Sequence, residues 1–224
     1  MAVNSRASVY ASMAITRPCF SNLLSYQRII AHLYLIIERQ DMAHFEKKIS
    51  STEIYSGKVI RVTVDEVEQE NGRRAKREFV HHNGGACIAA LTDAGEIYMV
   101  RQFRYPIGKE ILELPAGKLE PGEDPLEAAK RELEEECGLT AEHYENLGDF
   151  YPTVGYCGEI IYTYLATGLH ATQMHPDEGE FLTPVKMPLN EACDMVMRGE
   201  ICDGKTIAAI LKLKLHLQSP ISRC

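Results

Sequence analysis

The sequence predicts an α/β fold in which helices cover a mixed β-sheet as an α/β/α sandwich, preceded by a small N-terminal β subdomain. Three observations predict it. Apolar and polar residues alternate over residues 59–82, a strongly delimited helix occupies residues 125–137, and strand patterns lead into two helical patterns near the C-terminal end. We expect the domains to be residues 42–85 for the β subdomain and 86–224 for the sandwich.

Strand patterns dominate the chain before the predicted helix. Residues 59–82 alternate around Asn71-Gly72, the strongest short signal for a hairpin turn. Residues 86–106 contain two strand patterns separated by a turn at Asp93 to Glu96, and the second pattern carries Arg101 and Arg104 near its end. Residues 111–117 then lead into the segment that contains the helix. After the helix, the sequence predicts strands at 147–153, 159–169 and 181–189, followed by helices at 188–200 and 206–217.

Residues 125–137 carry clear signals for a helix start and stop. Asp124 is a favourable N-cap, Pro125 suits the first helical position, and Gly138 favours termination. At 100° per residue, one stripe of this helix is apolar and an acidic strip lies beside it. The apolar residues are Leu126, Ala129, Leu133 and Cys137, and the acidic residues are Glu132, Glu135 and Glu136.

The segment 117–139 is strongly acidic, with eight acidic and three basic residues and a net charge of −5. Like charges at i and i+4, such as Glu132 and Glu136, oppose helix formation by about a few tenths of a kcal/mol. A hard divalent cation, Mg²⁺ or Mn²⁺, is the natural partner of such carboxylates, since no thiolate or imidazole cluster suitable for zinc is present. The alternative is a solvated acidic helix face.

Composition is that of an ordinary globular protein. The chain has 224 residues, of which 45% are hydrophobic and 25% are charged. A net charge of −8 and a pI near 5.5 argue against general nucleic-acid binding. The seven cysteines have no metal-ligand spacing, which indicates reduced thiols in a cytosol-like compartment. We therefore expect a cytoplasmic protein with no nucleic-acid or membrane partner.

The first 41 residues have a different composition. Arg6, Arg17 and Arg28 occur with five serines and no acidic residue before Glu38, as in an organellar presequence. The apolar run 29–37 is too short to span a bilayer. We interpret this segment as a disordered extension or as upstream of the true start at Met42, and organellar import is expected only if the segment is genuine.

Residues 117–139, GKLEPGEDPLEAAKRELEEECGL, match the pattern Gly-x5-Glu-x7-Arg-Glu-apolar-x-Glu-Glu-x-Gly-apolar, the Nudix box, so the chain resembles Nudix hydrolases. The resemblance implies a Nudix α/β/α sandwich that uses Mg²⁺, with Mn²⁺ as a substitute, in two or three ions. It implies that Glu132 and Glu136 bind metal, with Glu135 as an additional metal-binding or catalytic residue and the backbone carbonyl of Ala116 as a further ligand. It also implies that Glu123 and Arg131 form an orienting pair.

Segments around the box resemble the ADP-ribose pyrophosphatase subfamily over about residues 46–215. They are VRQFRYP, ELPAGKLEPGE, YPTVGYCGEIIYTYLA and DEGEF. The resemblance implies hydrolysis of ADP-ribose to AMP and ribose 5-phosphate, with Arg104 on the substrate phosphates. The other implied substrate contacts are Lys118 and Glu159 near the substrate, and Arg77 and Glu78 at the adenosine or terminal ribose.

The resemblance places the catalytic base on the acidic loop HPDEGEF, at Glu180 in preference to Glu178. It also implies a homodimer built through the β subdomain. His81, His82 and His175 are alternative bases, but lone histidines in polar segments usually face solvent. Two alternative functions remain, hydrolysis of another nucleoside diphosphate sugar and non-catalytic sensing of ADP-ribose. The intact Glu132, Glu135 and Glu136 favour an enzyme over a sensor.

Overall fold

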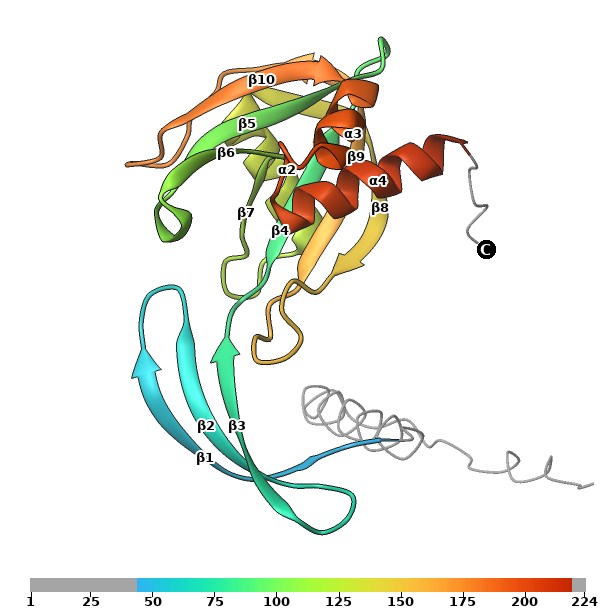
Figure 1. Cartoon of the computed structure of the whole chain (residues 1–224). Coiled ribbons are helices and arrows are strands. Elements are labelled where there is room, and N and C mark those ends of the chain that lie inside the picture. Colours follow the sequence, from blue (N-terminus) through green and yellow to red (C-terminus); the bar gives the residue numbers. More distant parts are fainter. Residues whose placement is uncertain (1–43, 219–224) are drawn as a thin grey trace, which may run out of the picture. The chain divides into compact units, whose positions relative to one another are not determined.

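The computed structural model describes residues 44–218, and the predicted extension over residues 1–41 lies outside them (Figure 1). Within these residues the chain forms two compact units. Residues 44–47 and 68–73 belong to the smaller unit, in which Glu70 accepts hydrogen bonds from the ring of His44 and the amide of Phe45. Residues 48–67 and 74–218 belong to the larger unit.

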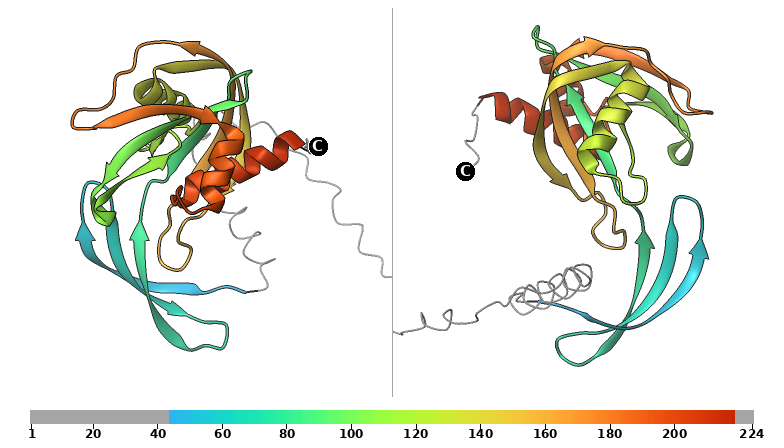
Figure 2. Two further views of the ribbon diagram at one scale, coloured as in Figure 1. Left: turned by 45° about the horizontal axis from the view of Figure 1, so that its top comes forward. Right: turned by 180° about the vertical axis from the view of Figure 1, so that it is seen from behind.

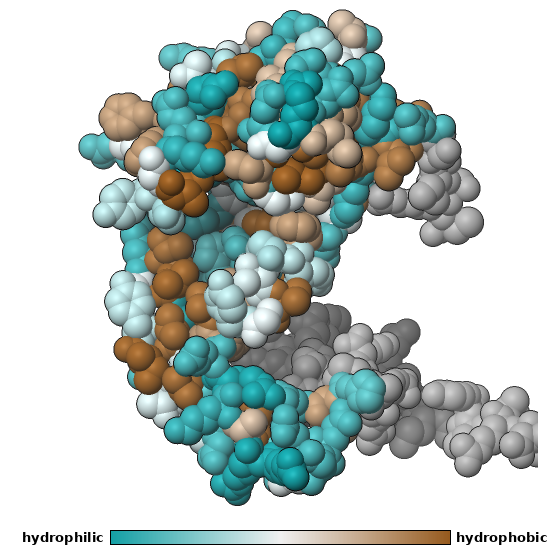
Figure 3. All heavy atoms as spheres, in the orientation of Figure 1, coloured by the Kyte–Doolittle hydropathy of each residue, from teal (hydrophilic) through white to brown (hydrophobic). Residues whose placement is uncertain are grey.

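The N-terminal strands form a three-stranded sheet in the order β1-β2-β3. Its strands are β1 (Lys47–Ser56), β2 (Arg61–Glu68) and β3 (Arg74–His81). The predicted turn joins β2 and β3, where Gly72 adopts a φ of 77° that favours glycine. The sequence pattern did not indicate β1, because all its residues are exposed and no apolar alternation marks it. Hydrophobic side chains are exposed along this sheet in Figure 3.

A four-stranded mixed sheet with the order β7-β4-β9-β8 forms the centre of the larger unit. Its strands are β7 (Ala116–Lys118), β4 (Gly85–Ala90), β9 (Ile161–Ala171) and β8 (Leu139–Phe150). The central pair β4 and β9 is parallel, and both outer pairs are antiparallel. Strand β8 starts at Leu139, directly after the helix stop at Gly138, and therefore eight residues before the predicted start at Leu147.

Helices cover both faces of this sheet, as Figure 2 shows from two sides. The predicted helix is α2 (Pro125–Cys137), and the C-terminal helices are α3 (Leu189–Met197) and α4 (Gly204–Gln218). Side chains of β4 alternate between the two faces, so that Ala86 and Ile88 pack with α2 while Cys87 and Ala89 pack with α4. The α/β/α sandwich predicted from the sequence is confirmed.

The sequence predicted a single mixed sheet, but the structure contains a second sheet, in the order β10-β5-β6. Its strands are β10 (Leu182–Pro188), β5 (Glu96–Arg104) and β6 (Lys109–Glu113), with a short 3-10 helix η2 (Tyr105–Ile107) between the last two. Strands β4 and β5 are consecutive in the chain but belong to different sheets, and the isolated bridge Leu91–Ile97 links them beside the turn. Among the described residues, no helix is long and apolar enough to cross a membrane.

Candidate active site

A cavity of 670 Å³ opens between the end of α2, strands β5 and β7, and the loop before β10. The predicted site residues that line it are Arg104, Ala116, Lys118, Arg131, Glu132, Glu136, Glu159 and Glu180. Five other predicted site residues are not among the described residues that line the cavity, namely Arg77, Glu78, Glu123, Glu135 and Glu178. The fold thus brings together residues that are far apart in the sequence.

Local signals in the sequence position α2 at this cavity. The carboxylate of Asp124 accepts hydrogen bonds from the amides of Leu126 and Glu127, and Gly138 ends the helix in the left-handed conformation at a φ of 61°. The buried residues Ala129 and Leu133 hold one face of the helix on the sheet. This orientation directs Glu132 and Glu136 from the edge of the buried face into the cavity.

Glu132 and Glu136 are buried, with 7% and 3% of their surface exposed. Loss of hydration raises the pKa of Glu132 to about 7 and that of Glu136 to about 8. Neighbouring carboxylates, including Glu180, contribute to both increases. The amide of Ala116 donates to Glu136 Oε2 at 3.0 Å, and within residues 44–218 no cationic side chain forms an ion pair with Glu136.

Arg131 pairs with two other acids of this helix, Glu132 and Glu135, and with Glu123 in the loop before it. Its Nε donates to Glu123 Oε1 at 3.0 Å, and its Nη1 donates to Glu132 Oε1 at 2.7 Å and to Glu135 Oε2 at 2.8 Å. Glu123 also accepts from the amide of Glu120, which ties the loop to the helix. One guanidinium therefore compensates three carboxylates, whereas Glu136 has no ion pair within residues 44–218 and, of the cationic side chains, the more distant Arg104 acts to lower its pKa.

Gly117 allows the strand β7 to approach the helix. A Cβ atom at this position would lie 1.8 Å from Glu132 Oε1 and 2.1 Å from its Cδ. No side chain fits there unless the buried carboxylate moves. The glycine that opens the Nudix box pattern is thus required by the position of Glu132.

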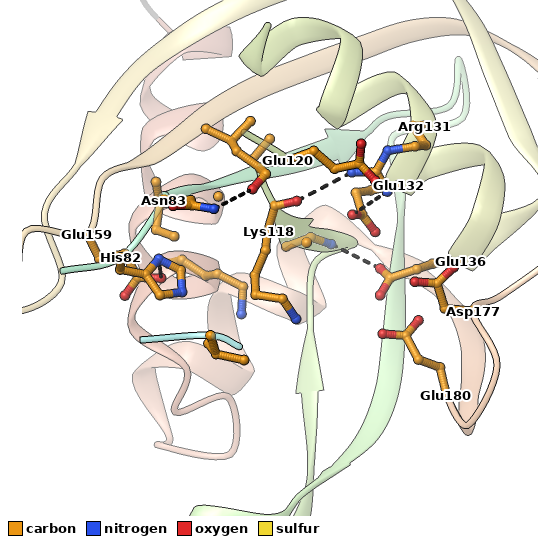
Figure 4. Close-up of a pocket in the computed structure, with 18 of the residues that line it drawn as sticks. His82, Asn83, Lys118, Glu120, Arg131, Glu132, Glu136, Glu159, Asp177 and Glu180 are labelled. Carbon is orange, nitrogen blue, oxygen red and sulfur yellow. Dashed lines mark hydrogen bonds and ion pairs between the residues drawn. The ribbon is translucent and has the colours of Figure 1, made fainter. Parts of the chain in front are cut away.

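The loop before β10 adds carboxylates to the cavity. Glu180 and Asp177 both line it, and Figure 4 shows them beside Glu136. Gly179, at a φ of 87°, forms the turn between them, in which the Glu180 amide donates to the carbonyl of Asp177. The sequence singled out Glu178 in place of Asp177, because the spacing within an acidic loop does not reveal which side chains turn inward.

The opposite side of the cavity carries His82 and Glu159, with Lys118 between the two sides (Figure 4). His82 Nδ1 lies 3.5 Å from Glu159 Oε1, and 11% of the His82 side chain is exposed. His81 is half-buried, and its Nε2 lies 3.0 Å from Thr63 Oγ1. The expectation of a solvent-facing histidine is wrong for His82, because the end of β3 is hydrogen-bonded to the loop between β8 and β9, whereas His175 is exposed as expected.

An ionic network around the buried Glu113 borders the cavity where β5, β6 and α4 meet. Arg104 donates through Nε to Glu113 Oε1 at 2.6 Å and through Nη2 to Glu113 Oε2 at 2.9 Å. Lys205 also donates to Glu113, and it contacts Asp203 at 3.0 Å. The sequence analysis found Arg104 but neither Glu113 nor Lys205, because their contact joins positions 92 residues apart.

Gln102 lies on the same face of β5 as Arg104 and lines the cavity. It is 9% exposed, and its Oε1 is the one buried side-chain N or O atom in the described residues that has no hydrogen-bond partner. An unpaired buried acceptor is unfavourable, which makes this atom a candidate for contact with a bound group.

The NUDIX domain family matches residues 81–210, which is more than half of the chain, and the nucleoside diphosphate sugar hydrolase N-terminal domain matches residues 46–80. The chain belongs to the Nudix family. The boundary between the two matches lies at residue 80, near the predicted domain boundary at residue 85, which stays a prediction.

Three curated relatives span most of this Nudix chain. An ADP-ribose pyrophosphatase from Bacillus subtilis is 44% identical and covers 78% of this chain and 96% of its own. A methanol dehydrogenase activator from Bacillus methanolicus is 43% identical, and the match covers 76% of this chain and 94% of the relative. An ADP-ribose pyrophosphatase from Mycobacterium tuberculosis is 38% identical, and the match covers 75% of this chain and 83% of the relative.

A solved structure described as an ADP compounds hydrolase superposes with a TM-score of 0.71, covering 80% of this chain and 97% of its own. Its sequence is 22% identical, so this likeness establishes the fold alone. It confirms the Nudix fold predicted from the box pattern.

Nudix hydrolases generally use divalent metal ions, and the chemistry of this site fits one. Within residues 44–218 no three His, Cys, Asp or Glu side chains are placed to enclose a metal together. Mg²⁺ does not need such a cage, since it commonly binds one or two carboxylates together with waters and substrate phosphates. The buried carboxylates of Glu136 and the neighbouring Glu132 are the groups that would hold such an ion.

Proposed function

We propose that this Nudix protein hydrolyses the pyrophosphate bond of ADP-ribose to AMP and ribose 5-phosphate. The observation that carries the proposal is the cavity in which buried Glu132 and Glu136 face Arg104 and Lys118, since it combines sites for divalent cations with positive charge for phosphates. Two of the three relatives described above are named ADP-ribose pyrophosphatase, which supports this substrate.

Glu132 and Glu136, with the backbone of Ala116, are the proposed metal-binding groups, and Mg²⁺ is the proposed ion, with Mn²⁺ as a substitute and two or three ions in all. Bound cations would supply positive charge to the pyrophosphate and to a water molecule. Glu123 and Glu135 hold Arg131, and Arg131 in turn fixes the carboxylate of Glu132.

Glu180 is the proposed base, because it lines the cavity whereas Glu178 does not. It accepts the proton of the attacking water, a new oxygen–phosphorus bond forms, and the bond from that phosphorus to the bridging oxygen breaks. Arg104 balances negative charge on the phosphates. Glu159 and Lys118 remain proposed substrate contacts at the other side of the cavity.

Arg77 and Glu78 lie on β3 and are exposed, outside the set of described residues that line the cavity. Their proposed contact with the adenosine or terminal ribose therefore depends on the partner subunit of a homodimer, which we propose as the working assembly. We also propose a cytoplasmic location, which is compatible with the free thiols of the described cysteines.

A second function, hydrolysis of another nucleoside diphosphate sugar, is favoured by the family match of residues 46–80. A panel of ADP-ribose, UDP-glucose, GDP-mannose, diadenosine polyphosphates and dATP with Mg²⁺ separates the two. We expect kcat/KM for ADP-ribose to be at least about tenfold higher than for the others, because discrimination must come from the pockets on each side of the pyrophosphate. Faster turnover of another sugar nucleotide would assign the second function, and binding without turnover would indicate a sensor.

A further inference from the structure

Glu113 is a buried ionisable residue that contacts two of the residues lining the cavity, and the proposed reaction assigns it no role. It is 1% exposed and lies at the end of β6, on the face that also carries Arg104 and Gln102. Its two oxygens accept both Nε and Nη2 of Arg104, at 2.6 Å and 2.9 Å, and Oε2 also accepts from Lys205. This bidentate geometry fixes the plane of the guanidinium as well as its position.

Lys205 comes from the first turn of α4, and only 14% of its side chain is exposed. Burial by itself lowers the pKa of Lys205, but the carboxylates of Asp203 and Glu113 outweigh this effect and raise it. The amine is therefore a cation. Asp203 holds the start of α4 by accepting from the amide and hydroxyl of Thr206 at 3.0 Å and 2.6 Å.

Both cations keep donor capacity for a ligand. Glu113 occupies the Nε and Nη2 edge of Arg104, which leaves Nη1. An ammonium has three donors, and Glu113 and Asp203 account for two of those of Lys205. Arg104 and Lys205 both line the same cavity as Glu132, Glu136 and Glu180. The cavity thus has a cationic group of residues as well as its carboxylates.

We propose that Arg104 and Lys205 together bind the diphosphate of the substrate, and that Glu113 is the positioning residue that holds both cations in place. Cations held by a buried carboxylate are oriented before the ligand arrives, so that binding requires little rearrangement of their side chains. The proposal rests on the proposed pyrophosphate hydrolysis, but it requires only that the ligand carries a diphosphate.

The test uses Lys205→Met and Glu113→Gln in the full chain, with Glu110→Gln as the control, because Glu110 is an exposed glutamate on the same strand. In Glu113→Gln an amide NH₂ replaces one acceptor, so either the Arg104 fork or the Lys205 contact is lost. We expect KM for ADP-ribose to rise at least about tenfold in both variants, with kcat changed less than about threefold, since a contact made equally in ground and transition states affects KM alone.

Calorimetric binding of methylenediphosphonate, a diphosphate that cannot be hydrolysed, is independent of the substrate assignment. We expect at least about tenfold weaker binding in Lys205→Met and Glu113→Gln and unchanged binding in Glu110→Gln. Wild-type binding of this probe by folded Lys205→Met would overturn the role of Lys205. If ADP-ribose is not hydrolysed but these losses occur, the diphosphate site stands and the substrate assignment fails.

A double-mutant cycle separates positioning from a purely structural role of Glu113. If Glu113 acts through Arg104, then Glu113→Gln weakens probe binding much less in an Arg104→Lys background than in the wild type. Fully additive losses would overturn the positioning role. If Glu113→Gln does not fold, Glu113→Asp replaces it, since the shorter side chain retains the charge but cannot span the same contacts. Unchanged probe binding in that variant would also overturn it.

Discussion

At the scale of single residues, the two buried carboxylates of α2 differ in their partners. Glu132 has the guanidinium of Arg131 at 2.7 Å, whereas Glu136 has an amide hydrogen bond and is more deeply buried. A buried carboxylate without an ion-pair partner is unfavourable in its ionised form. We therefore expect Glu136 to gain more than Glu132 from a bound divalent cation.

Glu136→Gln should lower kcat by on the order of 10³, because it removes charge that the proposed cations need while its amide keeps the size of the side chain. Glu134→Gln is the matched control, because Glu134 lies on the same helix but accepts a hydrogen bond from Thr172, and this variant should retain near wild-type turnover. Steady-state rates and circular dichroism measure both effects. Turnover above about a tenth of wild type in a folded Glu136→Gln would contradict the assignment.

The raised pKa of Glu136 predicts how the metal-free protein responds to pH. Its pKa is about 8 in the folded state, against an ordinary value of 4.5, because of burial. The folded state holds this proton more tightly, so the stabilisation is fully present below pH 4.5 and is lost as pH rises to about 8. In a metal chelator, melting temperature should fall less between pH 5 and pH 9 in Glu136→Gln than in wild type. Equal slopes would show that the carboxylate is ionised throughout.

Gln102 provides a test of whether ligands satisfy the unpaired acceptor in the cavity. A buried unsatisfied polar group costs about 1–3 kcal/mol, so Gln102→Leu should raise the melting temperature of the ligand-free protein. The same variant should gain less stabilisation than wild type from Mg²⁺ and ADP-ribose together. Thermal shift measurements with and without both ligands compare the two. A variant that is less stable without ligands would show that Gln102 has a structural role.

At the scale of elements, the contact between β7 and α2 depends on the missing side chain of Gly117. Gly117→Ala should displace the carboxylate of Glu132, since the new Cβ would lie 1.8 Å from its Oε1. We expect activity to fall at least about tenfold. Gly155→Ala is the control, because nothing lies within 4 Å of a Cβ there and its φ is not positive. Wild-type activity in Gly117→Ala would mean that Glu132 is free to move.

The elements also show how far the sequence determines the site. Helix α2 was predicted to the residue, because Asp124, Pro125 and Gly138 mark its ends through local interactions. The two sheets of the larger unit were not separated, since the pairing of β5 with β10 joins residues far apart in the sequence and leaves no local pattern. For the same reason Arg104 was recognised from its motif, but Glu113 and Lys205 were found only in the structure.

At the scale of the whole molecule, the three-stranded sheet leaves several of its hydrophobic side chains exposed to solvent. Every residue of β1 is exposed, and its hydrophobic side chains include Ile49 at 39%, Ile54 at 61% and Tyr55 at 56% exposure. Val59, in the loop after β1, is 49% exposed. An exposed strand of this length with apolar side chains is a site for pairing with another chain.

A homodimer through this sheet would cover these side chains, and it would explain why Arg77 and Glu78 can belong to a site although they do not line the cavity of their own chain. Light scattering should therefore give roughly twice the chain mass of 25.2 kDa. Ile54→Glu should shift the protein toward monomer and reduce activity, because it places a charge in the predicted interface. Met197→Glu, at a side chain that is 78% exposed on α3, is the control and should remain dimeric. A wild-type chain that is monomeric and fully active at assay concentration would exclude the dimer.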